Sequence, residues 1–195
     1  MLQKYVDYIN SKHNANIKII PVVHEQINYS PLHSLWHAIQ KINPHSDVKI
    51  FVQFGDDYLI DSDMIIKEMF GSDFQSLCVD TKPNISGNFG IVTYNKKDLH
   101  IIDIQRSNID ITRDGDCIHH KTKNNYKHGI MCGLMKITIE LIEYGIEHNY
   151  NSIGETLKNY SKHVKFVKVI ETESKFYTIG DPDNYKRTFL FLSNK

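Results

Sequence analysis

The chain has 195 residues, a length that predicts one domain with a sizeable core. Its 23 Lys and Arg balance 23 Asp and Glu, which argues against a dedicated nucleic-acid coat or a membrane-surface binder, because both need surplus positive charge. The 3 cysteines cannot build a disulfide framework and fit a reducing compartment. We therefore expect a cytoplasmic protein without nucleic-acid or membrane partners, and the sequence predicts no particular oligomeric state.

The first half of the chain alternates predicted helices and strands. Hydrophobic spacing predicts a helix over 2–12 and a strand over 16–23. Ser30 suits an N-cap and Pro31 a first helical position, so a helix is expected over 30–42. The next expected elements are a strand over 48–54, followed by Gly55-Asp56-Asp57, and a short capped helix over 61–70 that Gly71 ends.

The second half contains the clearest pattern of the sequence. Two β-rich runs, 88–94 and 99–105, flank the polar turn NKKD and predict a hairpin. A polar stretch without periodicity, about 106–130, is expected to form a flexible loop. The remaining expected elements are helices over 133–148 and 154–163 and strands over 164–171 and 187–192.

Cys132 stands directly before the expected 133–148 helix. A thiol at a helix N-terminus feels the positive end of the backbone dipole, which lowers its pKa and favours the nucleophilic thiolate. Gly133 would let a substrate backbone approach closely. The alternative is that Cys132 is a small buried apolar residue, the usual place of a free cysteine.

A cysteine nucleophile needs a base and a group that orients the base. Asp103 near the end of the hairpin could orient a base, but the opposite position in the first strand is Asn88, which cannot remove a proton. His100 alternates to the other face of its strand from Asp103. His128, His119 and His120 are the histidines nearest to Cys132 in the sequence and are the candidate bases.

The 106–130 stretch also carries possible ligands. Cys117, His119, His120, His128 and Cys132 are residue types that suit tetrahedral zinc, but their spacing is not a standard one, so we predict no metal site there. Lysines in and after this stretch could bind a phosphate-rich small molecule, and the alternative for each is a solvated surface position. The lysines chosen for this anion site are Lys121, Lys123, Lys127 and Lys165.

Short segments resemble known cysteine enzymes. Residues 34–39, SLWHAI, resemble the helix that opens ovarian-tumour-type deubiquitinases, with Ser34 at the position of their cysteine. In chain order, LQKYVDYINSKHNANIKII, NFGIVTYNKKDLHIIDIQRSN, MCGLMKITIEL and LKNYSKHVKFVKVIETESKF resemble the YopJ family of bacterial effectors. These are cysteine acetyltransferases built on the fold of adenovirus-protease and ubiquitin-like-protein-protease enzymes.

The resemblance implies a single α+β domain with a central mixed or antiparallel sheet, flanking helices and a papain-like or adenain-like protease architecture. It implies Cys132 as nucleophile and Asp103 as the orienting acid, while the family's histidine position falls on Asn88 and leaves His128 as a candidate base. It further implies acetyl-CoA as donor, inositol hexakisphosphate bound by the lysines, and host signalling proteins as acceptors after secretion into the host cytoplasm.

The function expected first is therefore a secreted effector-type cysteine acyltransferase that modifies host proteins. A cysteine protease acting on ubiquitin or ubiquitin-like proteins uses the same thiolate chemistry and stays open as an alternative. Two further alternatives are a catalytically inactive relative that binds a host protein through the loop, and a small module stabilised by metal at Cys117, His119, His128 and Cys132.

Overall fold

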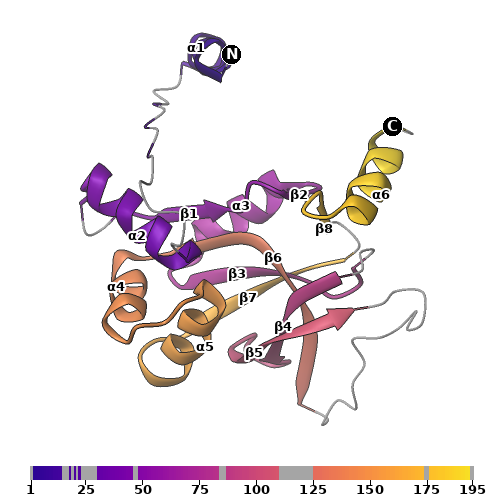
Figure 1. Cartoon of the computed structure of the whole chain (residues 1–195). Helices are drawn as coiled ribbons and strands as arrows, with labels where there is room; N and C mark the ends of the chain where they lie inside the picture. Colours follow the sequence, from indigo (N-terminus) through magenta and orange to yellow (C-terminus); the bar gives the residue numbers. More distant parts are fainter. Residues whose placement is uncertain are drawn as a thin grey trace.

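A six-stranded mixed sheet forms the centre of the computed structural model, which describes residues 2–14, 18, 20, 22, 30–45, 48–83, 87–109, 125–173 and 176–193. The strands are β1 (Ile50–Gln53), β3 (Gln75–Asp80), β4 (Gly87–Asn95), β5 (Ile101–Ile109), β6 (Tyr126–Ile137) and β7 (Val167–Thr172). Their order is β5-β4-β6-β3-β7, and β1 also pairs with β6 (Figure 1). Only β3 and β7 run parallel; the other pairs are antiparallel.

The long strand β6 holds the sheet together. Its first half pairs with β4, and its second half pairs with β3 on one edge and with β1 on the other. The register slips between Leu77 and Val79 of β3, opposite residues 131–135 of β6, so β6 carries a bulge there. This bulge lies where the pairing partner along one edge of β6 changes from β4 to β1.

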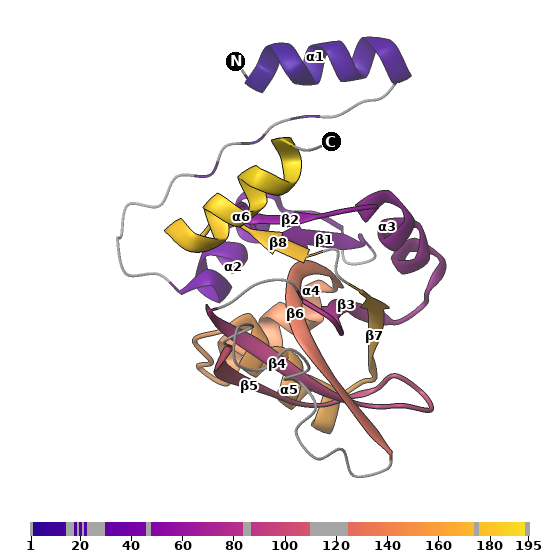
Figure 2. The same cartoon turned by 90° about the vertical axis from the view of Figure 1, so that its right-hand side faces the viewer.

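A second, two-stranded sheet and six helices complete the described fold. The small sheet pairs β2 (Asp57–Leu59) with β8 (Phe176–Thr178). The helices are α1 (Leu2–His13), α2 (Pro31–Ile42), α3 (Ser62–Gly71), α4 (Ile139–Glu147), α5 (Ile153–His163) and α6 (Pro182–Ser193). Figure 1 shows α2, α4 and α5 together at one end of the sheet and α6 beside β8 at the other, and both views show α1 apart from the rest (Figure 2).

Two apolar clusters lie against the sheet. The larger one packs α2, α4 and α5 against β3, β4 and β6 around Tyr94, Met135 and Tyr160. The smaller one lies under α3 and β8 and contains Met69, Cys132 and Phe176. Strand β3 contributes to both clusters, and each of its six residues is buried.

Several sequence predictions are confirmed. Helices begin and end close to the expected positions at α1, α2, α3 and α5, and the Ser30 hydroxyl accepts a hydrogen bond from the backbone N–H of His33 as the predicted N-cap. The hairpin predicted from 88–94 and 99–105 is β4–β5. Strand β7 overlaps the run expected at 164–171 but begins three residues later and ends one residue later.

The helix expected over 133–148 is wrong in its first part. Residues 133–137 belong to β6, because β1 and β3 hydrogen-bond to both of its edges there, and helix α4 starts only after the Thr138 N-cap. The loop expected over 106–130 is shorter than predicted, since β5 runs to Ile109 and β6 starts at Tyr126. Residues 110–124 lie outside the described residues.

The strand expected over 187–192 is also wrong. Its aromatic and β-branched run belongs to helix α6, which Pro182 opens and the Asp181 carboxylate caps by accepting the N–H groups of Asp183 and Asn184. The buried strand β3 was not predicted at all. The strand expected over 16–23 falls mostly on residues that the structure does not describe.

No helix in the described part of the chain is long and apolar enough to cross a membrane. The division into one domain stays a prediction.

Candidate functional site

Two adjacent carboxylates follow β1, at the point where the chain leaves the central sheet for the small one. Residues 55 and 56 make the turn, and Asp57 starts β2. Asp57 is in register with Thr178 of β8, and the N–H of Phe54 donates to the carbonyl of Gly133 in β6 at 2.9 Å. The turn that carries the carboxylates thus connects the two sheets.

The Asp57 carboxylate is held by hydrogen bonds yet resists ionisation. Burial, and after it the neighbouring charge of Asp56, raise its pKa from 3.8 to about 6. Hydrogen bonds from the Thr178 hydroxyl and the Gly133 N–H lower the pKa in part. At neutral pH this carboxylate is an ionised, partly desolvated group beside a second carboxylate.

Two glycines make room for the carboxylates. A Cβ at Gly133 would collide with the Asp57 carboxylate and lie 2.7 Å from the Cβ of Phe54. A Cβ at Gly180 would lie 2.7 Å from a carboxylate oxygen of Asp56. At Gly133 a side chain does not fit without displacing β6 or Phe54, whereas at Gly180 it would require the exposed Asp56 carboxylate to move.

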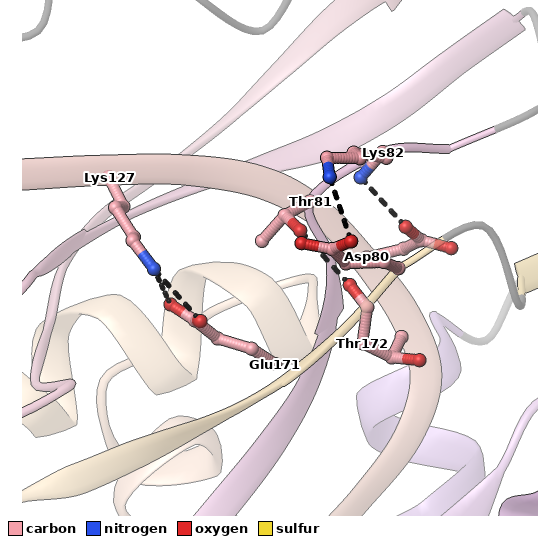
Figure 3. A network of polar contacts seen from close by, with 7 residues as sticks. Asp80, Thr81, Lys82, Lys127, Glu171 and Thr172 are labelled. Carbon is pink, nitrogen blue, oxygen red and sulfur yellow. Dashed lines mark hydrogen bonds and ion pairs between the residues drawn. The ribbon is translucent and has the colours of Figure 1, made fainter.

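The turn that carries the acids is fixed to β8. The Ile179 N–H donates to the Asp56 carbonyl at 2.8 Å, and the Thr178 hydroxyl lies 3.1 Å from the same carbonyl. Strand β8 is itself anchored by the buried carboxylate of Asp80 at the end of β3, which accepts the N–H of Phe176 at 3.0 Å and that of Lys82 at 2.9 Å (Figure 3). The position of the site therefore depends on β3 through β8.

A cavity of about 420 Å³ opens beside the acids, within the range of about 300–1,000 Å³ usual for small-molecule sites. It lies between the N-terminal half of α2, the end of β1 and the start of α5. Its walls are mainly apolar, with a hydroxyl, an amide and one carboxylate. The lining residues are Pro31, Ser34, Leu35, Val52, Gln53, Phe54, Gly55, Asp56 and Ile153.

The acids fit a divalent cation of the magnesium type. Among the described residues, no three or more His, Cys, Asp or Glu side chains gather into a metal cage. Magnesium does not need a cage, because one or two carboxylates, water and substrate phosphates usually hold it. Asp56 and Asp57 offer hard oxygen donors, and the repulsion that raises the pKa of Asp57 is one that a bound cation would relieve.

Cys132 does not lie at a helix N-terminus, as the sequence predicted. It lies inside β6, is 1% exposed and packs among apolar side chains such as Leu134 and Phe176. Burial and the neighbouring Cys78 thiol raise its pKa, so the thiolate is disfavoured. Its environment matches the alternative given above, in which Cys132 is a small buried apolar residue.

The other predicted catalytic residues are not gathered around Cys132. His128 is four residues away on the same strand, a separation of about 13 Å; its ring lies 2.9 Å from the Thr93 hydroxyl. Burial opposes ionisation of Asp103, but hydrogen bonds from Lys158 and Gln105 outweigh it and lower the pKa.

Asn88 is exposed on β4, in register with Asn108 of β5. It lies three residues before Ile91, the first residue of β4 that pairs with β6. Asn88, Asp103, His128 and Cys132 therefore do not form one site in this fold. His119 and His120, the other candidate bases, lie outside the described residues.

The lysines of the predicted anion site are divided between different partners. Lys127 pairs with Glu171 of β7 at 3.0 Å (Figure 3), and Lys165 pairs with Glu140 of α4 at 2.5 Å. Lys121 and Lys123 lie outside the described residues, as does Cys117 of the cysteine and histidine cluster. The two described lysines neutralise carboxylates on separate elements and form no shared anion site.

No protein-family model and no curated protein matches the sequence. Solved structures with a similar fold do exist. An apo UDP-glucose pyrophosphorylase has a TM-score of 0.64 at 13% identity, over 99% of this chain and 69% of that one. An inositol-1-phosphate CTP transferase from T. maritima has a TM-score of 0.63 at 12% identity, over 97% and 71%.

A CTP:phosphocholine cytidylyltransferase from Streptococcus pneumoniae has a TM-score of 0.56 at 15% identity, over 98% of this chain and 75% of that one. At such identities the likeness shows the fold alone, and it is a fold that this chain shares with these three nucleotidyltransferases. In each case this chain spans about seven tenths of the longer protein's length.

These likenesses correct the resemblance drawn from sequence. The papain-like or adenain-like architecture is wrong, because the arrangement of the sheet and helices is shared with nucleotidyltransferases. The cysteine acyltransferase and ubiquitin-protease functions and the effector assignment are wrong for the same reason. The expected cofactors acetyl-CoA and inositol hexakisphosphate are also wrong, since the proteins that share this fold are named for CTP, UDP-glucose and phosphorylated small molecules.

Sequence reasoning placed Asp56 and Asp57 after a strand but assigned them no role. The signal was a pair of adjacent carboxylates at the carboxyl end of an apolar run, IFVQFGDD. Thr178 and Gly180 could not be connected to that pair, because β8 lies more than a hundred residues later and its pairing with β2 is tertiary.

Proposed function

We propose that this chain binds a nucleoside triphosphate at the Asp56–Asp57 site and transfers its nucleotidyl group to a small phosphate monoester. The observation that carries the proposal is the partly desolvated Asp57 carboxylate directly after Asp56, whose side chain is exposed and lines a mainly apolar cavity. The names of the proteins that share the fold support it, since each describes a nucleotide joined to a phosphorylated small molecule.

In the proposed reaction, an oxygen of the phosphate monoester attacks the α-phosphorus of the triphosphate. The bond between the α-phosphorus and the bridging oxygen breaks, and pyrophosphate leaves with the electron pair. The reaction joins two phosphates and needs no covalent intermediate on the protein. Its barrier comes mainly from bringing together anions, so positioning and charge neutralisation are what the site must supply.

Residues of this chain supply the positioning. The cavity excludes water from the nucleoside with Leu35, Val52 and Phe54, and Gln53 offers an amide that can donate and accept hydrogen bonds. Asp56 and Asp57 would hold a divalent cation, which neutralises phosphate charge when bound. The Gly133 N–H and the Thr178 hydroxyl keep the Asp57 carboxylate in place.

The test is a panel of CTP, UTP and dTTP with glucose-1-phosphate, inositol-1-phosphate or phosphocholine and magnesium, with pyrophosphate release as the readout. We expect release with at least one pair, and a loss of about 10²-fold or more in the Asp57→Asn variant, because one preorganised charged group is removed. Asp7→Asn on α1 is the matched control and should leave the rate unchanged. Equal rates for wild-type protein and Asp57→Asn would refute the proposal.

A further inference from the structure

Strand β1 has an open edge next to the proposed site. Its four residues pair with β6, from Ile50 opposite Ile137 to Gln53 opposite Leu134. In the part of the chain that the structure describes, no strand pairs with its other edge. The Phe54 N–H points to β6, so the antiparallel alternation directs the N–H groups of Phe51 and Gln53 to the open edge.

This edge is short, but it carries no charge, proline or bulge that would prevent pairing. Exposed edge strands commonly hold an inward-pointing charge, a proline or a bulge that prevents another strand from adding. The sequence of β1 is Ile-Phe-Val-Gln, with three apolar residues and no charge. Lys49, directly before it, is engaged elsewhere: its amine donates to the Phe70 carbonyl at 3.2 Å and lies 5.7 Å from the Phe70 ring centre.

The cavity beside β1 has an acidic side chain and no cationic one among its lining residues. These include Asp56 and no Lys, Arg or His. The same residues Val52 and Gln53 line the cavity and form the open strand. A strand added at this edge would therefore border the cavity and could bring cationic side chains to an acidic rim.

The proteins that share this fold are longer. This chain aligns over nearly its whole length with 69–75% of three of them, so about a quarter to a third of each lies outside the shared part. An open strand edge at the centre of the fold is where additional chain can join the sheet without disturbing what is already paired.

We propose that the open edge of β1 is a docking site for an extended basic segment of a partner polypeptide, which pairs with Phe51 and Gln53 and borders the cavity at Asp56. Main-chain hydrogen bonds would give such a complex its register, and alternate side chains its specificity. The nucleotide as ligand of the cavity rests on the proposed function, whereas the docking itself does not.

The test uses the full chain and a synthetic acetylated peptide of alternating valine and lysine, without nucleotide. We expect the peptide to slow hydrogen exchange of the Phe51 and Gln53 amides. Gln53→Pro removes an outward N–H while keeping the ladder to β6, so it should weaken peptide binding at least tenfold. Gln53→Thr keeps the N–H and should bind as the wild-type protein does, and circular dichroism checks that both variants fold.

Three results would overturn the proposal. These are unchanged binding by Gln53→Pro, equal binding of an alternating valine and glutamate peptide, and a homodimer that Gln53→Pro converts to monomers, which would identify a second copy as the occupant. A nucleotide titration with and without peptide then separates the two proposals. If the peptide docks but CTP, UTP and dTTP bind equally to wild-type protein and Asp57→Asn, the proposed function fails and the docking site stands.

Discussion

At the scale of single residues, the environment of Asp57 departs from what stability alone would select. A carboxylate placed beside another and partly removed from water weakens the folded state at neutral pH, and such costs are typical of functional residues. The glycines Gly133 and Gly180 also support a functional role for the acids, because a Cβ at either position would press on one of the carboxylates.

Replacing Asp57 by Asn should therefore stabilise the protein at pH 7.5. Asn keeps an oxygen that can accept from Gly133 and Thr178 but removes the repulsion with Asp56. We expect a gain of about 1–2 kcal/mol, seen as a rise of roughly 3–6 °C in melting temperature in the absence of divalent cations. The gain should vanish at pH 4, where Asp57 is protonated; a variant less stable than the wild-type protein at pH 7.5 would contradict this account.

Gly133→Ala should have the opposite effect. The new Cβ meets the Asp57 carboxylate and the Phe54 side chain, and β6 is paired on both edges and cannot move away. We expect a loss of about 1–3 kcal/mol in urea unfolding. Gly154→Ala in α5 is the matched control, since its Cβ would lie 3.5 Å from Ile104 and a helix favours Ala, so it should be neutral or stabilising. Equal stability of the two variants would count against the close contact.

The sequence around Cys132 shows why a helix was expected where a strand lies. A cysteine before glycine and an apolar run has the same local pattern whether a helix or a buried strand follows. Residues 133–137 form a strand because β1 and β3, about 80 and 55 residues earlier in the chain, each pair with one edge of β6. No local signal carries that information.

At the scale of elements, β8 connects the buried end of β3 to the site. Asp80 accepts the Phe176 N–H that starts β8, and two residues later Thr178 reaches Asp57 (Figure 3 shows Asp80). The carboxylate is fully buried, so its loss leaves a backbone N–H without its acceptor. The site is thus sensitive to a residue that does not touch it.

Asp80→Ala should cost about 2–3 kcal/mol of unfolding free energy, because buried donors lose a charged acceptor. It should also weaken magnesium-dependent nucleotide binding, since β8 no longer holds the turn at Asp56. Asp80→Asn keeps one acceptor oxygen and should recover part of both losses. If Asp80→Ala loses stability but binds the nucleotide normally, β8 does not position the site.

Elements with strong local signals were predictable and those fixed by pairing were not. The helix at 30–42 has its N-cap, its proline and its apolar stripe in one window, and the β4–β5 hairpin has its turn between two alternating runs. The run 187–192 predicted a strand from its β-favouring residues, but it belongs to helix α6, which starts at Pro182. Strands β2 and β8 are three residues each and exist only as a pair.

At the scale of the whole molecule, the stability of the protein should depend on pH and on divalent cation together. The folded-state pKa of Asp57 is raised to about 6, so its contribution to stability is present at low pH and is lost as the pH rises from about 4 through 6. A cation bound by the ionised acids should restore it. We expect 5 mM magnesium to raise the melting temperature of the wild-type protein at pH 7.5 and not at pH 4.5. In Asp57→Asn, magnesium should leave the melting temperature unchanged at both pH values.

The architecture is shared with nucleotidyltransferases, whereas the sequence had pointed to cysteine enzymes. Short motifs at helical or strand spacing recur in unrelated folds, and only the arrangement of the sheet separates them. The central claim is that Asp56 and Asp57 hold a divalent cation together with a nucleotide.

Electron paramagnetic resonance of Mn²⁺ at pH 7.5, titrated with protein in the presence of CTP, UTP or dTTP, tests this claim most directly. The account predicts one bound Mn²⁺ per chain with at least one of the nucleotides, and affinity at least tenfold weaker in Asp57→Asn. Mn²⁺ bound equally by the wild-type and Asp57→Asn proteins, or none bound with any of the nucleotides, would contradict it.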